Sequence, residues 1–373
     1  MKVGMLTSVA ERCGICVYSA DLADGLRKLV DLEVVPVWDR VSPWETYLSD
    51  SADRLNARDI VHVQHEYSFW GSVLPGQNKF FEQMTSIRKP IVLTVHTLDP
   101  AAQVLGLSLP GSPIRRAMKR ILAAFPPYRN VIERRTFEVA DRIVVHDSEK
   151  AARLKGRGIP ESRIRVIPMG VPAPNPDPAL GDRFRREFGL EGRRLLVVFG
   201  FVRPGRGYET VLDALPMLSR PATLVIAGGP QTEAQAVYAD SLVRRASSLR
   251  LADRVVITGY LPDEKVAGAL RAADIILLPQ IAGTGSYSIQ VAFGYGKPIV
   301  ASDMPCFVDP EQSHGCPLTF ARGDARDLSA KLDSVLQGPP LAQKLSQCAL
   351  EYAKEHSWDR IAEKTVEVYR ELA

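Results

Sequence analysis

The chain has 373 residues, of which 46% are hydrophobic and 24% are charged, and its formal net charge is +4. This balance is typical of a globular protein and excludes intrinsic disorder, collagen-like repeats and small disulfide scaffolds. The weak positive charge also argues against nucleic acid as a partner. A single hydrophobic core stops growing at about 250–300 residues, so we expect the chain to divide into domains.

The cysteines and the hydropathy pattern predict the compartment. Five cysteines in a chain of this length indicate a reducing environment rather than a disulfide framework. No uncharged apolar run reaches about 18 residues, the length that a membrane-spanning helix needs. The first residues do not form a secretion signal. We therefore expect a cytoplasmic protein.

Cys13 and Cys16 form a Cys-x-x-Cys pair between the first expected strand and the following helix. A redox pair is one interpretation, because thiols at a helix start are acidified. We favour the simpler one, in which two small residues flank Gly14. No further ligands lie nearby in the sequence, so we expect no metal site.

The first half of the chain alternates short runs of Val, Ile and Leu with segments of helical periodicity. Continuous apolar runs are typical of strands that helices cover on both faces. Their alternation with helices predicts βαβ units and a parallel sheet. The expected strands are residues 3–6, 32–37, 60–63, 91–95, 143–145 and 165–167.

The pattern is interrupted at residues 169–178, where four prolines predict an interdomain linker, and then resumes. The predicted fold class is α/β, with two doubly wound Rossmann-like domains, 1–172 and 173–352. Ligands bind at the carboxyl ends of strands in such sheets, so we expect these ends to face across a cleft. The strands expected in the second domain are residues 195–199, 223–227, 255–258, 275–278 and 299–301.

Two loops of the second domain carry residues suited to an anion. The segment 200–207 follows a strand, precedes a helix and contains Arg203 and Arg206, whose guanidinium groups are well suited to phosphate. The alternative is a basic surface loop with two solvated arginines. Gly228 and Gly229 follow the next strand and allow close approach of a ligand to the backbone, although Gly-Gly-Pro is also an ordinary turn.

A third loop, residues 282–289, places glycines and hydroxyls before a helix that ends at Gly296. A helix start offers unpaired N–H groups and the positive end of the helix dipole to a phosphate. Ser286 or Ser288 is alternatively a simple N-cap. The loop lacks both a P-loop lysine and a G-x-G-x-x-G spacing, which argues against an ATPase or a dinucleotide-binding protein.

In the first domain, Gly14 lies in the turn after the first strand, and two histidines end neighbouring strands. His65, followed by Glu66, and His96 each come directly after an apolar run. Side chains at strand ends of a doubly wound sheet point into the crevice, so we expect these histidines to face a substrate. The alternative for each is a buried structural histidine.

Together these features resemble the retaining glycosyltransferases of the GT-B fold, specifically glycosyltransferase family 4 (group 1). The resemblance covers essentially the whole chain. It depends on the motifs at Gly14-Ile15, His65-Glu66-Tyr67, His96, 140–145 with Ser148, 166–171, 203–207, 227–230, 296–300 and Ser357-Trp358-Asp359-Arg360. The last motif implies that residues 353–373 form a helix that crosses back onto the first domain.

The resemblance implies that the second domain holds a nucleoside diphosphate sugar and that the first holds the acceptor. Arg203 and Arg206 correspond to the basic pair on the donor diphosphate, and His96 to a histidine near the transferred sugar; these three are the expected catalytic residues. No cofactor or metal is implied. The expected substrate-binding residues are Gly14, His65, Glu66, Gly228, Gly229, Tyr260, Leu261, Thr284, Gly285, Ser286, Tyr287 and Ser288.

The chain departs from the family pattern at three positions. Two glutamates that bind the donor sugar and ribose are replaced by Gly283 and Val291, and Met169 replaces a usual asparagine. The donor base and sugar are therefore open. A sugar-nucleotide-binding protein without catalysis, or another GT-B enzyme such as an epimerase or phosphorylase, is the alternative.

The implied reaction is metal-independent transfer of a sugar to an acceptor hydroxyl with retention at the anomeric carbon. The acceptor, a small molecule, glycan or lipid-linked sugar, is not specified by any motif. The basic stretch 114–122 is either a solvated helix face or a peripheral contact with anionic lipid at the inner membrane.

Overall fold

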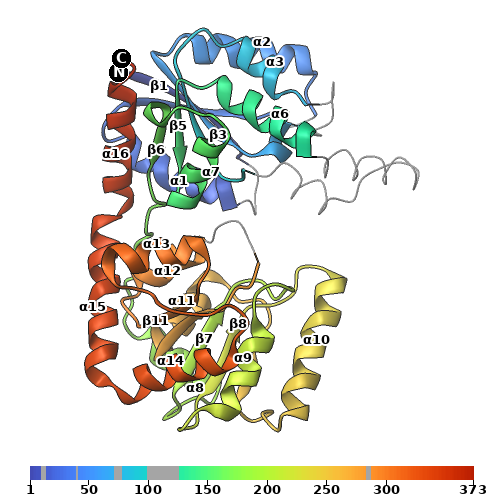
Figure 1. The fold of residues 1–373 in the computed structure, drawn as a ribbon, viewed down its shortest axis with the longest axis vertical. Helices are drawn as coiled ribbons and strands as arrows, with labels where there is room; N and C mark the ends of the chain where they lie inside the picture. The colour runs from blue at the N-terminus through green and yellow to red at the C-terminus, as the bar shows by residue number, and fades with distance from the viewer. Residues whose placement is uncertain (10–13, 39–40, 71–77, 99–125, 283–286) are drawn as a thin grey trace. The chain divides into compact units, whose positions relative to one another are not determined.

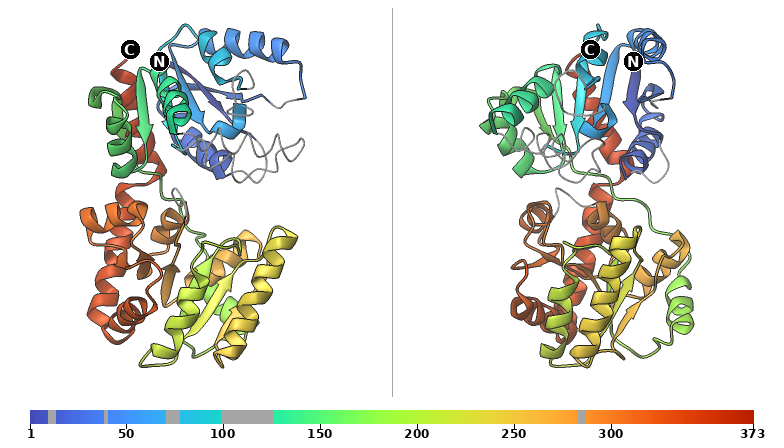
Figure 2. Two further views of the ribbon diagram at one scale, coloured as in Figure 1. Left: turned by 45° about the vertical axis from the view of Figure 1, so that its right-hand side comes forward. Right: turned by 90° about the vertical axis from the view of Figure 1, so that its right-hand side faces the viewer.

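The structure is a computed structural model that describes residues 1–9, 14–38, 41–70, 78–98, 126–282 and 287–373. The chain forms two compact units, each built on its own parallel sheet (Figures 1 and 2). The first unit combines Met1–Gly170 with Trp358–Ala373, and the second comprises Val171–Ser357. Residues 353–357, expected to belong with the returning helix, therefore lie in the second unit.

The first unit contains a six-stranded sheet in the order β2-β1-β3-β4-β5-β6 with all described pairs parallel. Its strands are β1 (Lys2–Thr7), β2 (Asp31–Pro36), β3 (Ile60–His65), β4 (Ile91–Val95), β5 (Arg142–Val145) and β6 (Ile164–Val166). Its helices are α1 (Gly14–Leu26), α2 (Trp44–Asn56), α3 (Phe80–Thr85), α6 (Pro126–Glu138), α7 (Ser148–Gly156) and α16 (Trp358–Arg370), with short 3-10 turns at Tyr67–Trp70 and Glu161–Arg163.

Two hydrophobic cores cover the two faces of this sheet. Side chains alternate between faces along each strand, so Val61 and Val63 pack toward α2, α3, α6 and α7, whereas Ile60 packs toward α1 and α16. The helices α1 and α16 approach closely, because a Cβ on Gly25 would lie 2.8 Å from Cβ of Ala362. The C-terminal helix thus completes the core of the first unit.

The second unit contains another six-stranded sheet, in the order β12-β11-β10-β7-β8-β9. Its strands are β7 (Leu195–Phe199), β8 (Thr223–Ala227), β9 (Val255–Ile257), β10 (Ile275–Leu278), β11 (Ile299–Ser302) and β12 (Leu318–Phe320). Its helices are α8 (Leu180–Glu187), α9 (Tyr208–Ala214), α10 (Glu233–Ser248), α11 (Asp263–Ala272), α12 (Tyr287–Gly294), α13 (Pro305–His314), α14 (Ala325–Gln337) and α15 (Pro339–Glu355), with a 3-10 turn at Leu215–Met217.

The predicted fold class is confirmed, since both units are doubly wound parallel α/β sheets. The residues of β7, β8 and β10 are all buried, which explains why their sequences are continuous apolar runs. The short strand β12 was not predicted from the sequence. None of the helices in the described part of the chain has the length and apolar character needed to span a bilayer.

One pair of cysteines forms a disulfide that the sequence did not predict. Cys316, which precedes β12, forms a disulfide with Cys348 of α15, across a sequence separation of 32 residues. Cys16 and Cys306 are not in a disulfide in the structure. Cys13 lies outside the described residues, so the Cys-x-x-Cys pair has no structural account.

Candidate functional site

The carboxyl edge of the second sheet brings four loops together. They follow β10, β7, β8 and β9, which are consecutive neighbours in the sheet. The loops are joined by backbone hydrogen bonds, from Ile281 N to Gly205 O at 3.0 Å and from Val202 N to Gly229 O at 3.0 Å. Because parallel strands end at one edge, residues from four separate chain segments form one surface there.

Glycines in these loops are needed for close backbone approach. Gly207 has φ +77°, and a Cβ there would lie 1.8 Å from the carbonyl oxygen of Pro279. A Cβ on Gly228 would lie 2.0 Å from the carbonyl oxygen of Gly200. A side chain at either position would push the loops apart. Packing of the protein itself thus accounts for these glycines.

Arg206 lies at the centre of this loop cluster and is only 9% exposed. Its Nη2 donates to the carbonyl oxygen of Phe199 at 2.5 Å. When the amide of Gln280 is oriented to donate to the Leu278 carbonyl, its oxygen accepts from Arg206 Nη1 at 3.0 Å. The Nε donor of Arg206 is buried and has no hydrogen-bond partner among the described residues. Such an unsatisfied charged donor is costly, and an anionic ligand would relieve it.

The other residues expected on this edge differ in exposure. Arg203 is exposed. Tyr260 follows β9 and is 77% exposed, so its ring is available to a ligand, whereas Leu261 is buried in the core of the unit. A Cβ on Gly229 would lie 2.6 Å from Tyr260 N, so the loops after β8 and β9 also touch.

The helix α12 begins at Tyr287, within the segment that the sequence analysis assigns to phosphate binding. Tyr287 and Ser288 occupy its first turn, while Thr284, Gly285 and Ser286, together with Gly283, lie outside the described residues. Val291, at one position where a glutamate was expected, packs against the hydrophobic core of the unit.

In the first unit, His96 belongs to a row of hydrogen-bonded side chains that is half-buried at His96 and His146 and fully buried at His62 and Gln64. Its Nε2 lies 3.0 Å from Gln64 Oε1, and its Nδ1 lies 3.4 Å from His146 Nε2. The ring of Tyr18, from α1, packs edge-on against that of His96 with centroids 4.9 Å apart. His146 Nδ1 donates to the carbonyl oxygen of Ile167 at 3.0 Å.

The chain continues through Gln64 to the C-terminal helix. Gln64 Nε2 lies 3.2 Å from His62 Nε2, and His62 Nδ1 lies 2.6 Å from the hydroxyl of Tyr369 in α16. His62 also bonds Thr94 at 2.7 Å. Strand alternation explains this row, because these side chains all point to the α1 and α16 face of the sheet.

Burial keeps these imidazoles neutral. It lowers the pKa of His62 to about 3 and that of His146 to about 4. Burial, together with the neighbouring His146, holds the pKa of His96 well below its usual range. At neutral pH the row therefore acts through hydrogen bonds and carries no charge.

His65 does not belong to this row, and the expectation that it faces a substrate is corrected. It alternates with Gln64 and so points to the opposite face, where its ring packs edge-on against Tyr67 and Phe80. It is 1% exposed, and its Nδ1 has no hydrogen-bond partner among the described residues. Burial lowers its pKa to about 3.

Glu66 and Gly14 occupy different environments. Glu66 is buried, accepts from Thr97 Oγ1 at 2.8 Å and from Tyr67 N at 3.0 Å, and its pKa is raised by burial. Gly14, the first residue of α1, is exposed, and no described atom lies within 4 Å of where its Cβ would be. Packing within the protein therefore does not require glycine at this position.

Several residues of these clusters were not predicted to belong to a site, namely His62, Gln64, His146, Gln280 and Tyr369. A signal existed for His146, which directly follows β5 just as His96 follows β4. Alternation along β3 also indicated that His62 and Gln64 share a face. The basic stretch 114–122 lies outside the described residues.

The chain therefore consists of two Rossmann-like units, each a doubly wound sheet. The second has a glycine-rich carboxyl edge around a buried arginine. The family described as "Glycosyltransferase Family 4" matches residues 14–173, and the family described as "Glycosyl transferases group 1" matches residues 182–352. The chain therefore belongs to the group 1, family 4-type glycosyltransferases.

Curated relatives carry a common name. A protein of Mycolicibacterium smegmatis named D-inositol 3-phosphate glycosyltransferase is 30% identical over 72% of this chain and 59% of its own length. One of the same name from Rhodococcus opacus is 26% identical over 75% of this chain and 62% of its own length. The matched part of the chain thus spans less than two thirds of either relative.

Solved structures share the fold at low identity. HepE of Anabaena, solved in complex with UDP, has a TM-score of 0.77 at 14% identity, with both chains covered completely. A glycosyltransferase from Rickettsia africae has a TM-score of 0.72 at 16% identity, with 100% of this chain and 98% of that one covered. These likenesses establish the fold alone.

Proposed function

We propose that the chain transfers a sugar from a nucleoside diphosphate sugar to an acceptor hydroxyl, with retention at the anomeric carbon. Family membership supports a glycosyltransferase, and the observation that carries the proposal is Arg206. A buried guanidinium with an unpaired Nε, set among glycine-rich strand ends, is suited to a diphosphate. Neither a cofactor nor a metal has a role in this proposal.

The reaction places developing negative charge on the departing diphosphate. Arg206 and the exposed Arg203 lie on one loop and supply guanidinium groups to that charge, aided by the start of α12. The acceptor oxygen forms a bond to the anomeric carbon on the face from which the diphosphate leaves. A phosphate oxygen takes the acceptor proton, so the reaction balances without a protein base.

His96 is proposed to contact the transferred sugar rather than to carry charge. Burial keeps its ring neutral, and the hydrogen bond to Gln64 and the packing of Tyr18 fix its orientation. A neutral imidazole in a fixed orientation is suited to a hydrogen bond with a sugar hydroxyl. Gly14 is proposed to leave space for the donor, since no described side chain fills it.

The first substrates to test follow from the comparisons. HepE of the same fold is solved with UDP and with UDP-glucose, so a uridine nucleotide is the first donor. The named relatives make D-inositol 3-phosphate the first acceptor. Val291, which packs against the core, stands where the family has a glutamate, so other groups would have to contact the ribose.

Calorimetry with UDP and UDP-glucose, followed by a transfer assay, tests the proposal. Arg206→Ala is expected to lower kcat/KM by about 10²–10³-fold. Arg220→Ala is the matched control, since this exposed arginine precedes β8 at the opposite edge of the sheet. Equal kcat/KM in the wild type and Arg206→Ala would contradict the proposal. Donor binding without hydrolysis or transfer to any acceptor would favour a non-catalytic binding protein.

A further inference from the structure

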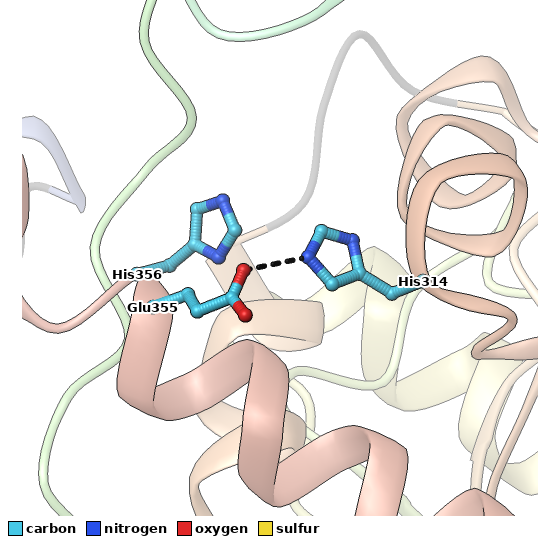
Figure 3. A group of neighbouring side chains, drawn as sticks. All are labelled: His314, Glu355 and His356. Carbon is cyan, nitrogen blue, oxygen red and sulfur yellow. Dashed lines mark hydrogen bonds and ion pairs between the residues drawn. The ribbon is translucent and has the colours of Figure 1, made fainter.

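Two helix ends of the second unit bring three potential metal ligands together. His314 is the last residue of α13, Glu355 is the last residue of α15, and His356 follows directly as its C-cap. Figure 3 shows the three side chains pointing toward one another. One ligand atom from each lies within 4.8 Å of the others. None of the residues proposed for sugar transfer belongs to this cluster.

The hydrogen bonds of His314 fix which ring nitrogen can bind an ion. The hydroxyl of Ser313 donates to the carbonyl oxygen of Asp309 at 2.8 Å, so its oxygen accepts from His314 Nδ1 at 2.7 Å. A neutral His314 therefore has its lone pair on Nε2, which lies 3.1 Å from Glu355 Oε2. The Nε2 lone pair and the carboxylate oxygen then face the same position, where a bound metal ion would be held by both. Fixing of one imidazole nitrogen by an outer partner is the usual arrangement of a metal-binding histidine.

The surroundings favour a cation in the same place. The carboxyl ends of helices carry partial negative charge, and both α13 and α15 end here. His356 is 6% exposed, and its ring stacks on Tyr352 with centroids 4.0 Å apart. Its Nδ1 donates to the carbonyl oxygen of Tyr352 at 3.0 Å, so the nitrogen that would bind an ion is Nε2. The disulfide of Cys316 and Cys348 joins the same two segments close to the cluster.

We propose that His314, Glu355 and His356 bind a divalent transition metal of the zinc type, with water completing the coordination. Two imidazoles and one carboxylate are a donor set that suits zinc, whereas calcium and magnesium prefer oxygen ligands. Tetrahedral zinc needs its ligand atoms about 3.3 Å apart, given bonds of about 2.0 Å. The side chain of Glu355 is 64% exposed and can turn to close the remaining distance.

A metal here stabilises the point where the chain enters and leaves the second unit. The carbonyl oxygen of His356 accepts from Val171 N at 2.8 Å, and Ser357 pairs with Val171. The unit begins at Val171 and ends at Ser357. An ion that fastens His356 to α13 therefore anchors both of these segments to the body of the unit. The role is structural and is separate from the proposed sugar transfer.

The test is zinc binding by the full chain, without a polyhistidine tag and without a reductant, so that the disulfide stays intact. Zinc chloride is titrated by calorimetry, and bound metal is counted by mass spectrometry after dialysis. The wild type is expected to bind one more ion than His314→Gln or Glu355→Gln, or to bind that ion at least about tenfold more tightly. Zinc is also expected to raise the Tm of the wild type but not of the two variants.

Glu351→Gln is the matched control, since it removes the same charge one turn earlier on α15 but no ligand atom. It is expected to bind zinc as the wild type does. Glu355→Gln changes an exposed side chain, and its circular dichroism checks that the fold is retained. Three outcomes overturn the proposal. In the first, the wild type binds no zinc, as expected of an ordinary imidazolium–carboxylate pair. In the second, zinc binds equally to the wild type and all variants. In the third, the wild type binds calcium or magnesium more tightly than zinc.

Discussion

His96 and His146 face each other through ring nitrogens 3.4 Å apart, while the opposite nitrogen of each ring bonds another group. His146 Nδ1 donates to a carbonyl oxygen, so a neutral His146 has its lone pair on Nε2. His96 Nε2 donates to Gln64 Oε1, so a neutral His96 has its lone pair on Nδ1. The facing atoms are both acceptors, which explains the long contact. The imidazoles of the row thus stay neutral at neutral pH, each with one ring proton, and protonation in acid disrupts the row.

The first prediction concerns stability in acid. An unfolded histidine takes up a proton near pH 6.5, whereas folded His62 and His65 stay neutral to about pH 3. Between these values the unfolded chain binds more protons, so the free energy of unfolding falls as the pH falls. The loss is on the order of 2 kcal/mol per histidine from pH 6.5 to pH 5. Urea denaturation at both pH values measures it.

His65→Phe separates this effect from general acid sensitivity. The variant keeps an aromatic ring against Tyr67 and Phe80 and removes a buried nitrogen that has no partner in the described structure. We expect the variant to fold at neutral pH. Below pH 6.5 its free energy of unfolding should fall by about 1.4 kcal/mol less per pH unit than that of the wild type. Donor binding should be unchanged, because His65 lies in the core. An unaltered pH slope would contradict the assignment.

Tyr369→Phe tests the hydrogen bond that ties the C-terminal helix to the first sheet. The hydroxyl of Tyr369 lies 2.6 Å from His62 Nδ1, and both residues are completely buried. Its removal leaves the imidazole nitrogen unsatisfied, which should lower the free energy of unfolding by about 1–3 kcal/mol. Tyr260→Phe removes an exposed hydroxyl and should change it by less than about 0.5 kcal/mol. Similar losses in the two variants would argue against a structural role for this bond.

Gly207→Ala tests the close contact between the loops around Arg206. Gly207 and Gly192 both have positive φ, but only at Gly207 would a Cβ meet the Pro279 carbonyl oxygen. Gly192→Ala should therefore lower the free energy of unfolding by about 1–2 kcal/mol, the backbone strain of a side chain at positive φ. Gly207→Ala should lower the free energy of unfolding by about 1–3 kcal/mol more than Gly192→Ala does, because the loops must separate. Gly207→Ala should also weaken donor binding, whereas Gly192→Ala should not. Calorimetry of donor binding to both variants tests this difference.

The disulfide gives a fourth prediction. Cys316 and Cys348 close a loop across 32 residues, and a cross-link of this length should contribute about 3–4 kcal/mol to the free energy of unfolding. The double variant Cys316→Ala with Cys348→Ala, measured with EDTA present, should have a free energy of unfolding lower than that of the wild type by this amount. Denatured wild type should expose two fewer thiols before reduction than after it. Equal thiol counts would show that the pair is reduced in the purified protein.

The alternation of apolar runs and helical segments predicted both sheets, because strands buried on two faces need continuous apolar residues. Strand β12 escaped prediction since only three residues, half-buried at Leu318 and Thr319, pair at the sheet edge. Local spacing also indicated that His96 directly follows a strand and that Arg206 lies in the loop between a strand and a helix. It did not indicate that Arg206 is buried, because Gln280 comes to it from the loop after a different strand, β10.

Neighbouring residues in the sequence were enough to predict every described strand except β12, and to show which polar residues follow the strands. The sequence by itself did not determine the pairing of His62 with Tyr369, the disulfide, or the group of His314 and Glu355. Each joins residues that are far apart along the chain, and only the packing of helices onto the sheets brings them together. The face that His65 occupies was fixed by alternation along β3, but its role became clear only when Phe80 packed against it.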